Sequence, residues 1–248
     1  MGEPGGFLKA VRLDWDRMLP DTPDPYLRAI PAVAGLDELA LDPAATFLVG
    51  DNGTGKSTLL EAIAVAADLN AEGGSRHFRF ETRASQSNLY KALRLVRSHR
   101  RPATDFFLRA ETLYNVATQV DQLGDTIIEH AYGGRSLHEQ SHGESFLALA
   151  LHRFEPNGFY VLDEPEAALS PQNQLALLVR IADLASRSSQ FLIATHSPIL
   201  LALPGATIYV LDAGGYHRAA YDELELVHLY RDFLAAPERY LRQLLAED

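Results

Sequence analysis

Eight consecutive residues, Gly50-Asp51-Asn52-Gly53-Thr54-Gly55-Lys56-Ser57, combine flexible glycines with one lysine and hydroxyl side chains. A glycine, four residues and then Gly-Lys-Ser is the spacing of a phosphate loop, in which backbone N–H groups point at phosphate oxygens. We expect Lys56 to reach the β- and γ-phosphates of ATP and Ser57 to bind Mg²⁺. The other expected phosphate contacts come from Gly50, Asn52, Gly53, Thr54, Gly55 and Thr58. The alternative is a glycine turn that precedes a helix by chance.

Two carboxylates, Asp163 and Glu164, follow the apolar run at residues 159–162. A buried strand of this kind can deliver Asp163 toward a Mg²⁺ ion that Ser57 also binds. Glu164 is then in place to polarise the water that attacks the γ-phosphate. Ordinary surface polarity is the alternative interpretation, but it leaves the combination with the phosphate loop unexplained.

The segments that must position these groups have the patterns of a parallel α/β fold. An apolar run at residues 46–49 leads into the glycine loop, and residues 57–69 then carry apolar side chains at helical spacing. A strand, a crossover helix and a second strand imply a parallel sheet with its functional loops at the carboxyl ends. The remaining expected elements are helices at 146–151, 171–186 and 222–245 and strands at 159–162, 190–195 and 206–211.

The start of the chain and its middle have different patterns. Residues 7–13 alternate apolar and polar side chains, which predicts an edge strand of an antiparallel portion, and a loop rich in proline and aspartate follows at 20–31. Residues 86–98 have apolar side chains at helical spacing with basic ones between them. They predict an amphipathic helix inside an insertion at about 76–140, within one domain that spans 1–248.

Charge is distributed unevenly along a chain whose net charge is −11. Residues 76–109 contain two acidic side chains (Glu81 and Asp105) and nine basic ones: Arg76, Arg79, Arg83, Lys91, Arg94, Arg97, Arg100, Arg101 and Arg109. This segment is where DNA or an acidic protein partner could bind. The alternative is a solvated basic helix that pairs with the acidic remainder.

Composition excludes several classes of protein. A chain of 248 residues with 47% hydrophobic content can bury one substantial core. No apolar run reaches the about 18 residues that span a bilayer, and the first 18 residues lack the pattern of a secretory signal. Cysteine is absent, which agrees with a reducing compartment. We therefore expect a cytoplasmic protein without direct membrane insertion.

Three further segments make the chain resemble the ABC class of ATPases. The run Ser141-His142-Gly143-Glu144-Ser145 resembles the signature motif, residues 165–170 resemble the D-loop, and His196 resembles the switch histidine. The resemblance implies a P-loop NTPase fold and a head-to-tail homodimer in which Ser141, Gly143 and Glu144 of one copy cap the γ-phosphate held by the other. It also implies catalytic roles for Glu164, His196 and Lys56. The alternatives are an ordinary capping box from Ser141 to Glu144 and a structural histidine.

The run from Asp163 to Pro171 is similar to stand-alone ABC ATPases of the RecF-like, chromosome-maintenance and phage-exclusion groups. That resemblance favours an ATP-hydrolysing switch in DNA repair, DNA processing or defence. A transporter's nucleotide-binding subunit and a nucleotide-dependent binding module are the alternatives. No residue is an evident Q-loop glutamine; Gln86 and Glu81 are the candidates, and Trp15 and Tyr26 are candidates for stacking on adenine.

Overall fold

The chain forms two β-sheets, and the larger one carries both the predicted phosphate loop and the predicted carboxylates. They are seen in a computed structural model of the chain, which describes residues 6–18, 25–71, 73–74, 87–109 and 142–245. The larger sheet has six strands and the smaller one three. Most of the predicted insertion lies outside the described residues, so its boundaries and the single domain of 1–248 stay predictions.

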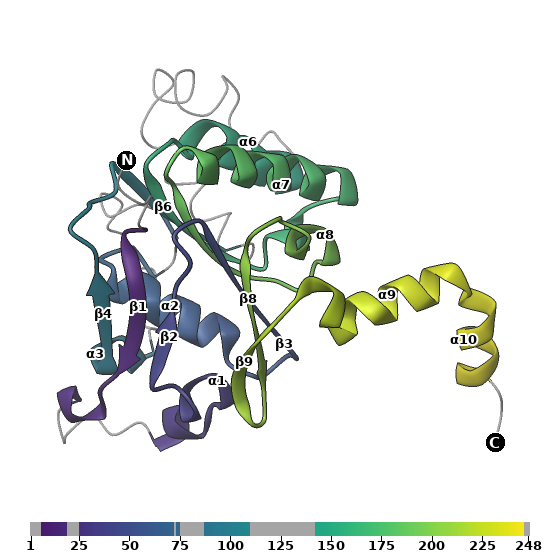
Figure 1. Cartoon of the computed structure of the whole chain (residues 1–248), viewed down its shortest axis with the longest axis horizontal. Helices are drawn as coiled ribbons and strands as arrows, with labels where there is room; N and C mark the ends of the chain where they lie inside the picture. Colours follow the sequence, from purple (N-terminus) through teal and green to yellow (C-terminus); the bar gives the residue numbers. More distant parts are fainter. Residues whose placement is uncertain (1–5, 19–24, 72, 75–86, 110–141, 246–248) are drawn as a thin grey trace.

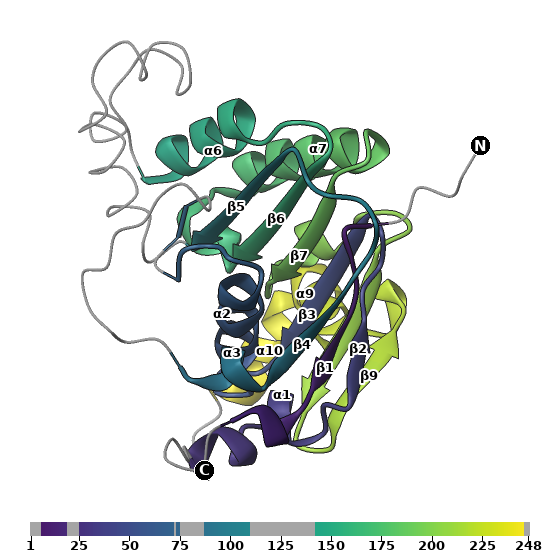
Figure 2. The ribbon, with the colours of Figure 1, turned by 90° about the vertical axis from the view of Figure 1, so that its left-hand side faces the viewer.

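The six-stranded sheet has the order β5-β6-β7-β3-β8-β9 (Figure 2). Its strands are parallel except β9, which runs antiparallel to β8. The two motifs follow β3 and β6, which are separated only by β7, so their carboxyl ends lie at one edge. The strands are β3 (Ala45–Gly50), β5 (Thr104–Arg109), β6 (Gly158–Asp163), β7 (Gln190–Ala194), β8 (Thr207–Asp212) and β9 (Gly215–Ala219).

Helices cover both faces of this sheet. On one face lie α6 (His142–Arg153) and α7 (Pro171–Ser186), and on the other lie α2 (Lys56–Ala66) and α3 (Leu89–Ala92) (Figure 2). Successive strand residues alternate between two hydrophobic cores, because side chains along a strand point to opposite faces. Phe47 packs in the core under α6 and α7, whereas Leu48 packs in the core under α2. The predicted α/β class, a mainly parallel sheet flanked by helices, is confirmed.

The smaller sheet has the order β2-β1-β4 and is antiparallel. Its strands are β1 (Leu8–Leu13), β2 (Glu38–Ala40) and β4 (Leu93–Arg97). The antiparallel N-terminal portion is therefore confirmed, but β1 is the middle strand and the prediction of an edge strand was wrong. The buried side chain of Gln190 bonds the backbone of β1 and joins the two sheets, since its Oε1 accepts from Phe7 N at 2.8 Å and from Leu8 N at 2.9 Å.

The amphipathic helix predicted for residues 86–98 is mostly absent. Only the four residues of α3 are helical, and the chain then enters β4. Its residues pair along nearly the whole of β1, with Leu93 opposite Leu13 and Leu95 opposite Val11. A pairing partner far away in the sequence decided the outcome, because a short apolar pattern fits both a helix and a strand.

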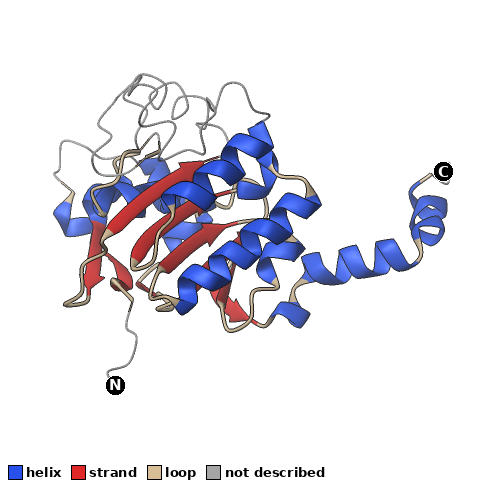
Figure 3. Ribbon diagram, turned by 90° about the horizontal axis from the view of Figure 1, so that it is seen from above, coloured by secondary structure: helices blue, strands red, loops and turns tan. Residues whose placement is uncertain are grey.

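The helical end of the chain was predicted correctly but is divided in two. Helix α9 (Glu225–Ala235) stops at Ala236, and α10 (Pro237–Leu244) begins with a proline. Both helices project from the body of the molecule (Figures 1 and 3). Within the described ranges, no helix is both long and apolar enough to cross a bilayer. The short helices are η1 (Trp15–Arg17), η2 (Pro25–Ala29), α1 (Pro31–Ala34), η4 (Pro165–Ala168), α8 (Pro198–Leu201) and η5 (Tyr221–Glu223).

Candidate functional site

The glycine loop connects the end of β3 to the first turn of α2, as predicted. Gly55 is the N-cap of α2 with φ at 93°, and Gly53 has φ at 85°, in the left-handed region that favours glycine. A Cβ at Gly55 would also lie 2.1 Å from Ile30 Cγ2. Asp51, Asn52 and Gly53 are exposed, so this backbone can be reached by a ligand at the N-terminus of α2.

Lys56 is folded back into the loop. Only 4% of the residue is exposed, and its Nζ donates to the carbonyl oxygens of Gly50 at 2.6 Å and of Asp51 at 3.1 Å. Burial lowers the pKa of Lys56, and the nearby carboxylates of Glu164 and Asp163 oppose that shift. A buried ammonium held mainly by backbone carbonyls is well placed to bind an anion such as the phosphates of ATP.

Ser57 and Asp163 meet at the edge of the sheet. The Ser57 hydroxyl donates to Asp163 Oδ1 at 3.0 Å, and Asp163 is 5% exposed. Two adjoining oxygen ligands suit Mg²⁺, which takes one or two protein ligands and completes its shell with phosphates and water. Among the described residues, no cluster of three or more His, Cys, Asp or Glu side chains could hold a metal without such help. These residues fit a nucleotide-bound Mg²⁺ ion.

Arg109 belongs to the site, which the sequence analysis missed. It ends β5 directly opposite Asp163 in the strand register, and its Nε lies 3.2 Å from Asp163 Oδ2. Its Nη1 lies 2.6 Å from Glu61 Oε2 on α2. The prediction that Arg109 belongs to a basic segment that binds a partner was therefore wrong, because its guanidinium forms ion pairs with Asp163 and Glu61 inside the molecule. The signal was the apolar run at 106–108, which ends in a charged residue as the run before Asp163 does.

Glu164 and His196 approach each other from two neighbouring strands. Glu164 follows β6 with φ at 47° and ψ at 52°, a conformation that costs a residue with a side chain about 1 kcal/mol or more. Its Oε1 lies 3.8 Å from His196 Nε2. That nitrogen is shielded from solvent and makes no hydrogen bond within the described part of the chain. An unsatisfied ring nitrogen beside a strained carboxylate is typical of a site that a ligand completes.

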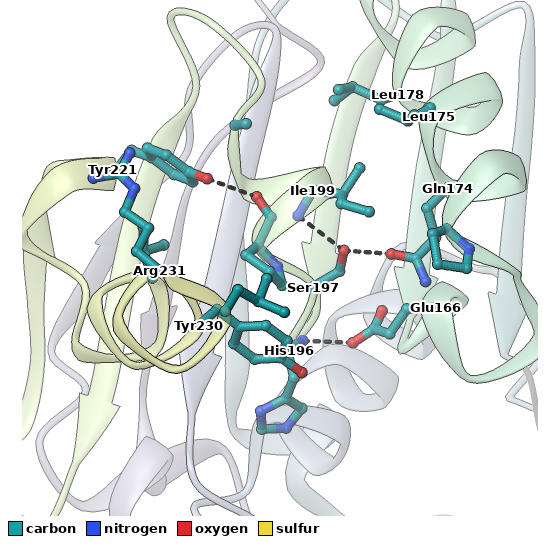
Figure 4. Close-up of a pocket in the computed structure, with 15 residues that line it drawn as sticks. Glu166, Gln174, Leu175, Leu178, His196, Ser197, Ile199, Tyr221, Tyr230 and Arg231 are labelled. Atoms are coloured by element: carbon teal, nitrogen blue, oxygen red, sulfur yellow. Dashed lines mark hydrogen bonds between the residues drawn. The ribbon is translucent and has the colours of Figure 1, made fainter. Parts of the chain in front are cut away.

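The turn that carries His196 is held by Glu166 from the predicted D-loop. Glu166 accepts from Thr195 Oγ1 at 2.7 Å and from the backbone N–H of His196 at 2.5 Å. On the far side of the turn, Ser197 Oγ donates to Gln174 Oε1 at 2.6 Å (Figure 4). The loops after β6 and β7 therefore form one hydrogen-bonded unit, which holds the backbone from which the His196 side chain extends.

The predicted signature motif is only partly described. Ser141 lies outside the described residues, as do Glu81 and Gln86, the Q-loop candidates. Gly143 and Glu144 are in the first turn of α6, and a Cβ on Gly143 would lie 2.7 Å from the carbonyl oxygen of Ala168 in η4. Close approach to η4 therefore requires glycine here, whatever its role toward a nucleotide. That role stays a prediction.

The adenine candidates also stay predictions. The guanidinium of Arg28 lies 4.5 Å from the centre of the Trp15 ring, so that face already has a cationic partner. Tyr26 is 55% exposed. Neither observation assigns an adenine site.

Residues 45–124 and 116–202 match the profile of the family described as "AAA domain, putative AbiEii toxin, Type IV TA system". No curated protein matches the chain. Among solved structures, the "SMC head domain from Thermotoga maritima" is 16% identical with a TM-score of 0.45, over 86% of this chain and 98% of that one. A structure titled "An inward-facing conformation of a putative metal-chelate type ABC transporter" is 17% identical with a TM-score of 0.46, over 77% of each chain.

Proposed function

The chain belongs to the AAA domain family described as "putative AbiEii toxin, Type IV TA system", and on that premise we propose that it binds Mg-ATP at residues 50–58 and hydrolyses it between two copies. The observation that carries the proposal is the contact of Ser57 with Asp163 at 3.0 Å, beside the buried Lys56. The loop predicted to bind phosphate and the carboxylate predicted to bind the metal thus lie in contact with each other within the chain. Preorganised groups of this kind do not have to rearrange during the reaction.

Hydrolysis requires a water molecule to attack the γ-phosphorus while the bond to the β–γ bridging oxygen breaks. Glu164 would accept the proton of that water, and the bridging oxygen would leave on ADP. Lys56 would neutralise charge on the β- and γ-phosphates, and bound Mg²⁺ would do the same through Ser57 and Asp163. His196 would donate from Nε2 to the γ-phosphate, which satisfies the nitrogen that makes no hydrogen bond among the described residues.

The second copy supplies the cap over the γ-phosphate in this proposal. Ser141, Gly143 and Glu144 at the start of α6 would present backbone N–H groups and a helix N-terminus to the partner's ATP. Gly143 packs closely on the backbone of Ala168, so the start of α6 lies directly against the loop after β6. ATP bound by one copy would then also contact the other copy.

We propose that this cycle serves as a switch in DNA repair, DNA processing or defence, in a cytoplasmic protein. Support for a DNA or acidic protein partner comes from Arg94 and Arg101, which are exposed. Other basic residues of 76–109 have internal partners: Arg97 lies 3.7 Å from Asp68, and Arg100 donates to Asn157 at 2.8 Å. The alternative of a basic segment that pairs with the acidic remainder therefore accounts for part of it. Arg76, Arg79 and Arg83 lie outside the described residues.

Retention of ATP tests the proposed function. The Glu164→Gln variant, loaded with Mg-ATP and freed of excess nucleotide by gel filtration, should keep about one ATP per chain, because the water is no longer activated. Adding Ser141→Arg to this variant should release the nucleotide, because the arginine blocks the partner's cap. The proposal is wrong if Glu164→Gln loses ATP as fast as the unmodified chain, or if Ser141→Arg makes no difference.

A further inference from the structure

The two helices that project from the body, α9 and α10, have an apolar surface that the described residues of the body leave uncovered. We call residues 225–245 the arm. Every residue from 231 to 245 is exposed except Tyr240, which is half-buried. The arm's exposed large apolar residues are Leu229, Tyr230, Phe233, Leu234, Leu241, Leu244 and Leu245, and Leu234 and Leu244 are each 73% exposed. Figures 1 and 3 show that α10 lies away from both sheets.

Helices this short need a partner to be stable. An isolated helix of fewer than about 12 residues is marginal in water, and its stability comes mostly from packing of an apolar face. Helix α9 has 11 residues and α10 has 8. Between them the structure shows one ring contact, with the centres of Phe233 and Tyr240 5.8 Å apart. The first half of α9 is anchored on the body, since Val227 is 1% exposed and Arg231 pairs with Asp222 at 2.8 Å. It is therefore α10 whose helical form the described contacts do not account for.

The charges of the arm indicate what kind of partner covers it. Three acidic side chains balance three basic ones: Glu225, Asp232 and Glu238 against Arg231, Arg239 and Arg242. Nucleic acid and anionic membrane surfaces require an excess of basic residues, which the arm lacks. The whole chain carries a net charge of −11, so two copies repel each other except where a surface is locally neutral. The arm is such a surface.

The size of the apolar surface suits a dimer. Seven large apolar side chains that each retain roughly 100 Å² of exposed surface amount to roughly 700 Å² per copy, close to the ~800 Å² that each partner buries in a standard interface. A two-fold axis would place each arm on its equivalent, so every exposed apolar residue finds an apolar partner without a second protein. At the base of the arm, Tyr230 and Leu234 line a cavity of about 700 Å³ with Leu175 and Leu178 of α7 (Figure 4).

We infer that the arm is a dimerisation element that packs against the arm of a second copy of this chain and holds the two copies together without nucleotide. The proposed ATP sandwich would then close within an existing pair instead of assembling from separate chains. This contact does not depend on ATP binding, so the two proposals can fail separately.

Sedimentation equilibrium of the full chain without nucleotide tests the inference. We expect particles of twice the 27.3 kDa chain mass, both for the unmodified chain and for Lys56→Ala. The double variant Leu241→Glu/Leu244→Glu should sediment as single chains, with dimerisation weakened at least about 100-fold. Leu151→Glu is the matched control, because Leu151 is an exposed leucine of α6, outside the arm; this variant should remain dimeric. Retained ATP binding by the double variant would show that it is folded.

The absence of cysteine from the chain allows a second, independent measurement. In a two-fold contact only residues near the axis meet their own equivalents. Leu234→Cys and Leu244→Cys chains, oxidised without nucleotide singly and as a mixture, should therefore form covalent dimers in at least one of the three combinations, whereas Leu151→Cys chains should not. Four results would overturn the inference: an unmodified chain that is monomeric without nucleotide, a double glutamate variant that stays dimeric, arm cysteines that cross-link in no combination, or a Lys56→Ala chain that is monomeric. A Lys56→Ala chain that is monomeric would mean that association requires nucleotide, which leaves the proposed sandwich intact and excludes the arm.

Discussion

The nucleotide site and the arm have opposite patterns of burial. At the site, charged and polar side chains are inside the molecule: Lys56 is 4% exposed and Asp163 is 5% exposed. In the arm, leucines lie on the surface of the molecule, and Leu234 is 73% exposed. Each pattern is unfavourable in an isolated chain, because buried charges lose hydration and exposed leucines order water. The comparison teaches that each region has the burial pattern that suits its proposed partner: Mg-ATP at the site, and the apolar surface of a second copy at the arm.

The largest expected effect separates chemistry at the site from any role of the arm. Glu164→Gln should reduce the kcat of ATP hydrolysis by about 10²- to 10⁴-fold, because the water loses its general base, and should leave ATP binding nearly unchanged. The matched control is Glu225→Gln, a carboxylate at the start of α9, which should keep its full rate. Steady-state phosphate release measures kcat, and titration with a fluorescent ATP analogue measures ATP binding. Equal losses in the two variants would contradict the assignment of Glu164.

The second effect contrasts the core with the arm in stability. Phe154 is fully buried, and its ring stacks on Tyr160 with the centres 4.3 Å apart. Phe154→Ala should lower the free energy of unfolding by about 3–5 kcal/mol, since it leaves a cavity. Leu234→Ala should change it by no more than about 0.5 kcal/mol when the chain is monomeric, because little packing is lost. Urea unfolding at low protein concentration measures both. A large loss for Leu234→Ala would mean that the arm packs on its own body.

A third experiment tests how far the site is already formed without ligand. Arg109→Ala removes the guanidinium that pairs with the buried Asp163 and the partly buried Glu61, and should lower the free energy of unfolding by about 1–3 kcal/mol. With Mg-ATP the difference should shrink, because the metal neutralises Asp163. Arg97→Ala is the control, since its pair with the exposed Asp68 should contribute under about 1 kcal/mol. Thermal unfolding with and without Mg-ATP measures the effect; a difference that does not change with Mg-ATP would separate Arg109 from the metal site.

The smallest expected effect concerns pH. Burial lowers the pKa of Lys56 in the free site, and bound phosphates favour its charged form and so raise that pKa. ATP affinity should therefore be full at neutral pH and fall, by up to about tenfold per pH unit, as the pH rises between the pKa of the free site and that of the complex. In Lys56→Arg this dependence should be absent, because a guanidinium stays protonated. Nucleotide titrations in alkaline buffers measure it, and the same slope in both chains would show that another group titrates.

Much of the fold could be predicted because the relevant signals are local. The helix expected at residues 171–186 matches α7 (Pro171–Ser186), since Ser170 caps it and proline occupies its first turn. The strands at 46–49, 159–162 and 190–195 were also found, because long buried apolar runs have few alternatives. The helix predicted at 86–98 was wrong and β1 was misplaced at an edge, since each depended on which distant strand paired with it.

Residues of the candidate site also fall into two groups: those that local sequence patterns reveal and those that depend on tertiary contacts. Residues 50–58, Asp163, Glu164 and His196 could be named from the sequence, because each lies at the end of an apolar run that is legible without the rest of the chain. Arg109 could not, because its ion pairs with Glu61 and Asp163 join β5 to α2 and β6. Glu166 was placed in the predicted D-loop, but its bonds to Thr195 and His196 could not be foreseen.

By itself the sequence determined the parallel α/β fold and predicted a phosphate loop and a metal-binding carboxylate at one edge of it, because glycine conformations, charge spacing and apolar periodicity act over a few residues. Only the tertiary structure decided which charges are used inside the molecule and which apolar faces stay outside it. Arg109 turned inward and the arm turned outward for the same physical reason. Burial depends on what the rest of the chain places against a side chain, and neighbours in the sequence do not specify that.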